Sequence, residues 1–320
     1  MAHVFLFPGQ SSADPRALDR ARRAHPAGDA VAADAVDVLG RVEADRYLAG
    51  PEAPLRSNRD VQMVVFLASQ MYLRALAAEG VAGDASLGLS LGEYSHLVHI
   101  GALSFAETLA LVSERGHCYD LAPQGVMVTV LGADRDTVEA AVARGGRAGG
   151  TVVVSNYNAP TQHVIAGHDD AVTRVAAALE DEGAHTIVIE PHVPMHSPLM
   201  VGVALQFGRT VAAAPWRRPG LAYRPNVTAA SIAPTHADAP CFVDLLTRHV
   251  SEPVRWDASL DRVAAEYPDA TFVEVGPGGV LHNLVGRGWK RLARQRMDAG
   301  DDHDSATHVR SVLEALCARA

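Results

Sequence analysis

The sequence predicts an α/β fold, in which a large α/β-hydrolase-like domain is interrupted by a ferredoxin-like α+β subdomain. Three observations lead to this prediction. A short apolar segment runs through Gly88-Leu89-Ser90-Leu91-Gly92 directly into a helix candidate. Strands and helices alternate compactly between residues 125 and 190, whereas longer helices occupy the chain before and after. The length of 320 residues, 48% of them hydrophobic, is sufficient for a large core with an insertion.

The first part of the large domain is expected to span residues 1–124. Its predicted elements are a strand at 3–7, a long helix at 58–79, a strand at 85–89 and helices at about 93–100 and 104–121. The first strand is a short apolar run that Pro8-Gly9 closes as a turn. Ser104 and Glu107 have the spacing of a capping box, which predicts where the last of these helices begins.

Residues 125–190 are expected to form the inserted subdomain. The predicted order is a strand at 126–131, a helix at 135–144, strands at 152–155 and 163–166, a helix at 169–182 and a strand at 186–189. This β-α-β-β-α-β order is the split arrangement of ferredoxin-like subdomains. The large domain is expected to resume over residues 191–320, with helices at 242–249 and 258–267, a strand at 271–275 and a closing helix at 304–318.

Composition and charge exclude several classes of function. The formal net charge of -9 argues against a nucleic-acid partner, which requires clustered positive charge. The arginine clusters at 16–23, 217–218 and 287–296 are interpreted as solvated surface charge, with docking of a phosphate or an acidic partner as the alternative. The longest apolar runs are far shorter than the roughly 20 residues that cross a bilayer, so no membrane segment is expected.

The N-terminal residues show neither a basic leader nor a small-residue cleavage site, so a cytoplasmic location is expected. The cysteines Cys118, Cys241 and Cys317 are scattered and form no CxxC pair. Neither a disulfide framework nor a zinc site is therefore expected, and no other metal or cofactor is predicted.

The strongest chemical signal is the GxSxG pattern around Ser90, which is typical of a nucleophile elbow. A tight strand-turn-helix junction crowds its neighbours, which explains glycine two residues before and two residues after the serine. The helix that follows directs free backbone amides at the place where an oxyanion would develop. The motif alone is short and also occurs in ordinary loops. A generic α/β-hydrolase shares it, although that fold places an acidic residue before its histidine in a different element order.

A serine hydroxyl needs a base to become a nucleophile at neutral pH, and the chain has fifteen histidines. The best candidate is His196, because it follows the last predicted strand of the subdomain, where it would face a cleft between the two domains. Four other histidines lie in helical contexts that favour packing or surface roles: His96, His99, His117 and His249.

Six segments, taken together and in order, give a more specific indication. The chain resembles the malonyl-CoA:acyl carrier protein transacylases and the acyltransferases of polyketide synthases, of the free-standing type that acts in trans. The segments are Phe7-Pro8-Gly9-Gln10, Gly88-Leu89-Ser90-Leu91-Gly92-Glu93-Tyr94, Leu111-Val112-Ser113-Glu114-Arg115-Gly116, Asn156-Tyr157-Asn158-Ala159-Pro160-Thr161-Gln162, Pro194-Met195-His196-Ser197-Pro198-Leu199-Met200 and Glu274-Val275-Gly276-Pro277-Gly278.

The resemblance implies a ping-pong reaction through an acyl ester of Ser90, with His196 as the base. It also implies that the backbone amides of Gln10 and Leu91 form the oxyanion hole. Arg115 matches the arginine that holds the free carboxylate of the acyl group in malonyl-type members. The implied partners are an acyl-CoA, malonyl-CoA being favoured, and an acyl carrier protein.

Three further residues are implied to bind substrate: Asn156, Met195 and His249. The chain departs from the family at Leu89, where histidine is common, and at His249, where glutamine is common. We expect His249 either to orient the base through its carbonyl or to contact the substrate through its side chain. Met195 lies at a position associated with acyl selectivity. An acyl hydrolase or a carrier-to-carrier acyltransferase is therefore the alternative enzyme, and a non-catalytic scaffold protein is the alternative from another class.

Overall fold

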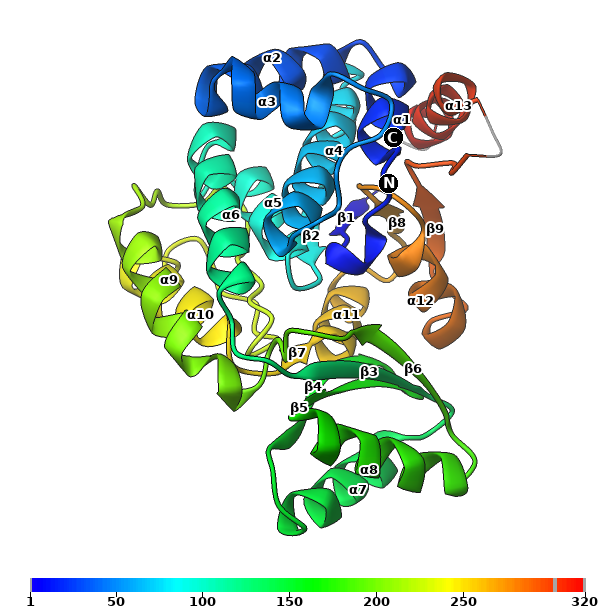
Figure 1. The fold of residues 1–320 in the computed structure, drawn as a ribbon. Helices are drawn as coiled ribbons and strands as arrows, with labels where there is room; N and C mark the ends of the chain where they lie inside the picture. The colour runs from blue at the N-terminus through cyan, green and yellow to red at the C-terminus, as the bar shows by residue number, and fades with distance from the viewer. Residues whose placement is uncertain (1, 302–303, 319–320) are drawn as a thin grey trace.

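The computed structural model describes residues 2–301 and 304–318 and contains two separate β-sheets (Figure 1). A parallel four-stranded sheet has the order β2-β1-β8-β9 and contains β1 (His3–Phe7), β2 (Ala85–Gly88), β8 (Thr271–Glu274) and β9 (Ala293–Arg296). A five-stranded sheet has the order β6-β3-β5-β4-β7 and contains β3 (Val126–Leu131), β4 (Val152–Ala159), β5 (Gln162–Gly167), β6 (His185–Glu190) and β7 (Val254–Arg255). The α/β class predicted from the sequence is confirmed.

Helices cover both sheets (Figure 1). Those before the five-stranded sheet are α1 (Ala17–Ala24), α2 (Ala27–Leu39), α3 (Arg41–Leu48), α4 (Asn58–Ala78), α5 (Gly92–His99) and α6 (Phe105–Asp120). The five-stranded sheet has α7 (Arg135–Arg147) and α8 (Asp169–Asp181). The later helices are α9 (Val201–Ala213), α10 (Ala239–His249), α11 (Trp256–Glu266), α12 (Val280–Gly288) and α13 (Ser305–Cys317). Short 3-10 turns occupy Gln10–Ser12 and Pro198–Met200.

Strand β1 is central to the parallel sheet, and its side chains alternate between two cores. Phe5 and Phe7 pack with the helices on one face, in the cluster that contains α4 and α6, whereas Val4 and Leu6 pack on the other face with α11 and α12. Because both faces are covered, the strand is apolar throughout rather than alternating. This accounts for the short continuous apolar run at the start of the sequence.

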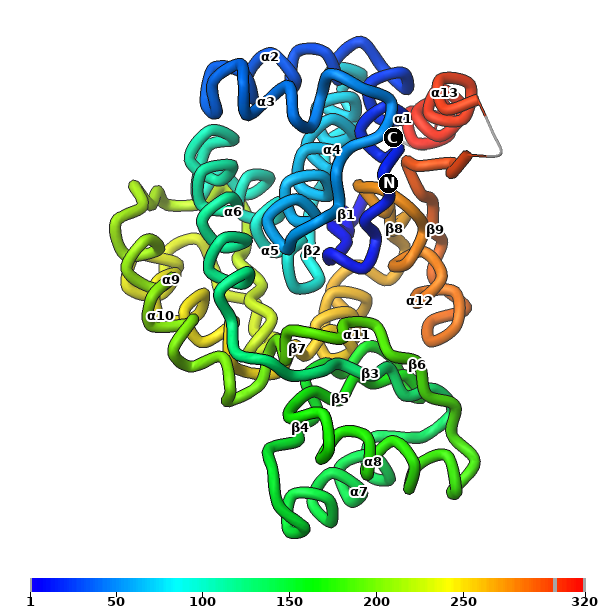
Figure 2. The backbone as a smooth tube through the Cα atoms, in the orientation of Figure 1, coloured from blue at the N-terminus to red at the C-terminus, as the bar shows by residue number. Residues whose placement is uncertain are grey.

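The five-stranded sheet has a core of its own. Its inward side chains, such as Val128, Val130 and Ile165, pack with Val172 and Leu179 of α8 and with α7. Figure 2 shows the chain entering this sheet from α6 through β3 and leaving it from β6 toward α9. Strand β7, from a later part of the chain, pairs in parallel with β4 and so connects the two parts of the molecule.

Helix α4 is long and apolar enough, by length and composition, to cross a membrane. In the fold, 72% of its most apolar window is buried inside the protein. It packs against α1, α2 and α6, and even its polar residues Asp60 and Gln62 are buried. Its composition therefore reflects its position as a core helix.

Three helices between residues 17 and 48 were not predicted, because abundant alanine obscures their periodicity. The interpretation of the arginine cluster at 16–23 as solvated charge is wrong for Arg20. That side chain is buried and donates to both carboxylate oxygens of Asp298, at 3.0 and 2.9 Å. Asp298 is itself inaccessible to solvent, so this ion pair ties α1 to the segment after β9.

Candidate functional site

Ser90 stands at a sharp turn between β2 and α5. Its backbone has a φ of 49°, in the left-handed region that is unfavourable for side-chain-bearing residues. A Cβ atom on Gly88 would lie 2.0 Å from the carbonyl carbon of Gly92, and one on Gly92 would lie 2.0 Å from the carbonyl oxygen of Phe7. Only glycine fits at either position, so the GxSxG pattern is explained by the close packing of this junction.

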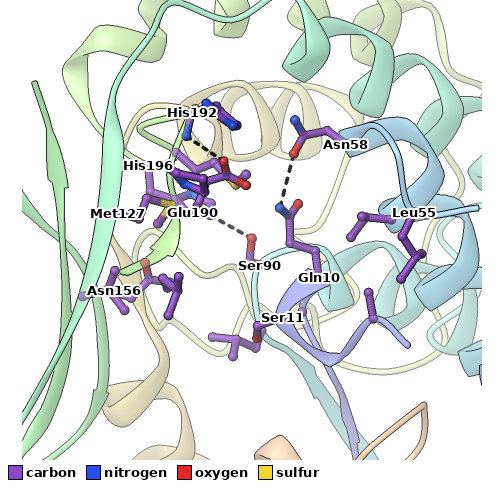
Figure 3. A pocket seen from close by; sticks show the side chains of 18 of the residues that line it. Gln10, Ser11, Leu55, Asn58, Ser90, Met127, Asn156, Glu190, His192 and His196 are labelled. Carbon is purple, nitrogen blue, oxygen red and sulfur yellow. Dashed lines mark hydrogen bonds between the residues drawn. The ribbon is translucent and has the colours of Figure 1, made fainter. Parts of the chain in front are cut away.

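His196 faces Ser90 across the turn, as Figure 3 shows, with Nε2 2.8 Å from the serine Oγ. Its Nδ1 lies 2.7 Å from the carbonyl oxygen of His249, which can only accept, so Nδ1 carries the proton and Nε2 is the acceptor. Burial, with a further contribution from the nearby Arg115 cation, lowers the pKa of His196 to about 3. The ring is therefore neutral at physiological pH and able to accept the serine proton.

The other candidate histidines are placed differently. His96 and His99 both contact the hydroxyl of Ser86 inside the fold, and His117 is exposed on α6. His249 is buried, and its ring stacks on that of His196 with centroids 5.0 Å apart. Of the two roles considered for His249, its carbonyl makes the contact with His196, and its side chain does not line the cavity at Ser90. The structure thus brings the His249 carbonyl to the reacting pair, and a substrate contact by the His249 side chain stays a prediction.

A cavity of about 400 Å³ opens at Ser90 and His196. Figure 3 shows its walls, which come from both parts of the molecule. Predicted site residues on its wall are Gln10, Ser90, Asn156, Met195 and His196. The parallel-sheet side also contributes Leu55, Asn58 and Leu89, and the five-stranded sheet contributes Met127, Asn158, Val164 and Ile189.

Arg115 does not line this cavity but lies completely buried on α6. Its guanidinium donates to Gln62 Oε1 at 2.8 Å and to the Tyr119 hydroxyl at 2.9 Å, and it lies over the rings of Tyr94 and Tyr119. Its Nε has no partner, and within the described part of the chain no carboxylate oxygen comes within 4.0 Å of it. The charge of Arg115 acts on the buried carboxylate of Glu93 without contacting it, so the guanidinium has no direct ionic partner among these residues and could bind an anion.

A chain of side-chain amides leads from the cavity to Arg115. Asn58 accepts from Gln10 Nε2, and Gln10 accepts from Gln62 Nε2, both at 3.3 Å (Figure 3 shows the first contact). Gln62 then accepts from Arg115. The side chain of Gln10 is thus fixed, while its backbone N–H and that of Leu91 have no hydrogen-bond acceptor among residues 2–301 and 304–318.

Several residues of the site were missed by the sequence analysis. Asn226 accepts from the backbone N–H of Ser90 at 2.8 Å and donates to the carbonyl of Gly88 at 2.7 Å. The backbone N–H of Asn226 donates in turn to the buried carboxylate of Glu93. Glu93 directly follows the GxSxG motif, so its position was visible in the sequence. No sequence pattern distinguishes Asn226 or Gln62.

The described residues contain no group of three or more histidine, cysteine or acidic side chains arranged to hold a metal ion. Cys118, Cys241 and Cys317 are unpaired thiols.

Comparison with known proteins relates this geometry to a family. The acyl transferase domain family matches residues 34–310. The malonyl CoA-acyl carrier protein transacylase of Escherichia coli (strain K12) is 32% identical over 289 residues, which cover 89% of this chain and 92% of that protein. The polyketide biosynthesis protein ThaF of Burkholderia thailandensis is 31% identical, over 88% of this chain and 24% of that protein.

Solved structures agree with this result. FabD from Acinetobacter baumannii has a TM-score of 0.88 at 28% identity and covers 99% of both chains. A malonyl-transacylase in complex with its type II polyketide synthase acyl-carrier protein has a TM-score of 0.86 at 28% identity, over 97% of this chain. The chain thus belongs to the acyl transferase domain family.

Proposed function

We propose that this enzyme transfers a malonyl group from coenzyme A to the phosphopantetheine thiol of an acyl carrier protein through an ester of Ser90. The observation that carries the proposal is a serine-histidine pair at 2.8 Å, on the wall of a cavity. Beyond this wall lies a buried arginine, which no carboxylate of the described residues contacts and whose Nε has no hydrogen-bond acceptor among them. Relatives named as malonyl transacylases over nearly their full length support it.

In the first half-reaction, Ser90 Oγ attacks the thioester carbonyl carbon and His196 Nε2 takes the serine proton. The carbon–sulfur bond then breaks, and the proton passes from His196 to the departing thiolate of coenzyme A. In the second half-reaction, the carrier thiol loses its proton to His196 and attacks the ester, and Ser90 leaves as the alcohol with that proton. The N–H groups of Gln10 and Leu91, which have no acceptor within the described residues, would stabilise the oxyanion of both intermediates.

The role proposed for Arg115 is to bind the free carboxylate of the malonyl group. In this structure Gln62 Oε1 occupies one of its donors, so a carboxylate would replace or join a neutral acceptor that is already there. Asn156 and Met195, both on the cavity wall, would shape the space between Ser90 and Arg115. An uncharged acyl group offers nothing to satisfy the buried guanidinium, and this disfavours a hydrolase for neutral acyl chains.

The same proposal extends to the organisation of the chain. Residues 1–124 and 191–320 would form an α/β-hydrolase-like domain, and residues 125–190 a ferredoxin-like insertion. The strand order β6-β3-β5-β4, with antiparallel neighbours, supports the second assignment. The three unpaired thiols are compatible with the expected cytoplasmic, free-standing enzyme.

Intact-mass measurement after incubation with malonyl-CoA tests the function. We expect one malonyl group on the wild-type protein, none on Ser90→Ala, and loss of the label when a phosphopantetheinylated carrier is added. Ser86→Ala is the matched control, because Ser86 also lies against a histidine, His96, at 2.7 Å but away from the cavity. Absence of label on the wild-type protein, or release of free malonate instead of malonyl carrier, would contradict the proposal.

A further inference from the structure

Glu93 has a carboxylate that is completely buried, three residues after Ser90 in the first turn of α5. Its Oε1 accepts from the Tyr223 hydroxyl at 2.5 Å, and its Oε2 accepts from the backbone N–H of Asn226 at 3.1 Å. Burial raises the pKa of Glu93 to about 7, while these two donors and the charge of Arg115 favour the ionised form. Because burying a carboxylate is costly, we expect Glu93 to have a role in the site.

One arm of contacts leads from Glu93 to the nucleophile. Because Glu93 holds the backbone of Asn226, the Asn226 carboxamide stays in place beneath the elbow. Its oxygen accepts from the N–H of Ser90 at 2.8 Å and its nitrogen donates to the carbonyl of Gly88 at 2.7 Å. The two bonds clamp both sides of a turn in which Ser90 has a φ of 49°, a conformation that persists only when its surroundings enforce it.

A second arm leads from Glu93 to the base. His249 Nδ1 lies 3.4 Å from Glu93 Oε2, slightly longer than a well-formed hydrogen bond. Because burial lowers the pKa of His249 well below its usual value, the ring is neutral and the contact is polar rather than ionic. The His249 ring stacks on His196, and its backbone carbonyl accepts from His196 Nδ1 at 2.7 Å. The orientation of the catalytic base therefore depends on a residue whose side chain faces the same carboxylate.

We propose that Glu93 is a positioning residue that aligns the nucleophile and the base from one buried carboxylate, through Asn226 on one side and His249 on the other. The assignment rests on the proposed function only in taking Ser90 and His196 as the reacting pair. It assigns Glu93 no contact with substrate, and it gives the imidazole of His249 a role in orienting the base.

An alkyl fluorophosphonate tests the alignment without any acyl-CoA. Ser90 Oγ forms the bond to phosphorus, fluoride leaves with its electron pair, and His196 takes the serine proton. Glu93→Gln can keep an oxygen at the position of Oε2 by turning its NH₂ to the Tyr223 hydroxyl, which can accept, so the informative substitution is Glu93→Leu, which removes the acceptor that faces both Asn226 and His249. We expect the rate constant of phosphonylation to fall roughly 10- to 100-fold, the scale of a misplacement of about 1 Å, with the reagent concentration for half-saturation little changed.

Two further substitutions separate positioning from general destabilisation. Glu274 is an equally buried carboxylate that accepts two backbone N–H groups at the start of α12 and contacts neither reacting residue. Glu274→Leu is expected to lower the melting temperature but not the phosphonylation rate constant of the folded protein. His249→Gln retains the carbonyl and an N–H donor for Glu93, so it should retain more reactivity than His249→Leu, which has no donor.

A rate constant for Glu93→Leu within about twofold of wild type, or an equal loss in Glu274→Leu, would overturn the proposal, since the effect would then be absent or merely structural. Equal losses in His249→Gln and His249→Leu would remove the second arm and overturn it also. If the wild-type protein is phosphonylated at Ser90 but is not acylated by malonyl-CoA, the proposed function is refuted. The test of Glu93 remains valid in that case, because it does not use malonyl-CoA.

Discussion

Gln62→Glu should convert the site from one that prefers a carboxylated acyl group to one that does not. Gln62 Oε1 lies 2.8 Å from the Arg115 guanidinium, and the substitution places a carboxylate of the same shape there. Two unit charges about 4 Å apart at a protein-like effective dielectric of about 20 interact by about 4 kcal/mol. Once the introduced carboxylate compensates Arg115, a malonyl carboxylate would lose about 2 to 4 kcal/mol of this attraction, or roughly 30- to 700-fold in kcat/KM.

The assay compares malonyl-CoA with acetyl-CoA as acyl donors, by the rate at which each labels Ser90. The substitution also replaces the Gln62 Nε2 donor to Gln10 by an oxygen, which affects acylation by both CoA esters alike. We therefore expect the malonyl-to-acetyl rate ratio to fall by the stated factor, because acetyl has no carboxylate to lose. Gln70→Glu is the matched control, since it makes the same substitution at a buried position further along α4 that has no hydrogen bond to Arg115. An unchanged malonyl-to-acetyl ratio in Gln62→Glu would refute Arg115 as the carboxylate site.

Three other predictions concern the base, the elbow and the buried ion pair. Because burial lowers the pKa of His196 to about 3, the base stays deprotonated from about pH 8 to pH 5, whereas Glu93, whose pKa burial raises to about 7, gains a proton in this range. Any decline in the rate of Ser90 acylation over this range should therefore disappear in Glu93→Leu, and a decline centred near pH 6.5 that persists in Glu93→Leu would contradict the low pKa of His196. Gly92→Ala would put a Cβ 2.0 Å from the Phe7 carbonyl oxygen. We expect urea unfolding to show a loss of more than about 3 kcal/mol in the free energy of unfolding, or no folded protein at all. A loss below about 1 kcal/mol would show that the backbone around Ser90 can relax. Arg20→Met leaves the buried carboxylate of Asp298 without its cation. We expect the free energy of unfolding, from the same urea measurement, to fall by about 3 to 5 kcal/mol. An unchanged unfolding midpoint would mean that water reaches Asp298.

The local elements of the fold could be predicted because their signals are local. The apolar run of β1 is bounded by Pro8-Gly9, and the start of α6 has a capping box in which Ser104 and Glu107 make both expected contacts. The helices between residues 17 and 48 could not be found in this way. Their burial depends on tertiary packing against α4 and on the ion pair of Arg20 with a residue 278 positions away.

The site was predictable to the same extent. Ser90 and His196 lie in motifs whose residue types are required by their chemistry, and the structure brings these side chains together across 106 residues of sequence. The contact of His196 with His249 uses a backbone carbonyl, which any residue supplies, so the identity of residue 249 contains no signal for it. Asn226 lies in a segment with little regular secondary structure, where periodicity gives no information.

The two parts of the molecule contribute unequally to the reaction. His196 follows β6 of the five-stranded sheet, but its hydrogen bonds go to the end of α10: its N–H donates to Val250 at 3.2 Å and its Nδ1 to His249. Ser90 is held by Asn226 from the loop before β7. The reacting pair is therefore fixed to the parallel-sheet part, while the five-stranded sheet supplies one wall of the cavity. One face of the five-stranded sheet has its own core, whereas Met127, Val164 and Ala166 on its other face pack in the cluster that contains α4 and α6. The cavity wall on this sheet is therefore packed against the parallel-sheet part but, within the described chain, makes no hydrogen bond to the reacting pair. Substitutions on the Met127 and Ile189 wall should accordingly affect which acyl group or carrier enters more than they affect the activation of the serine.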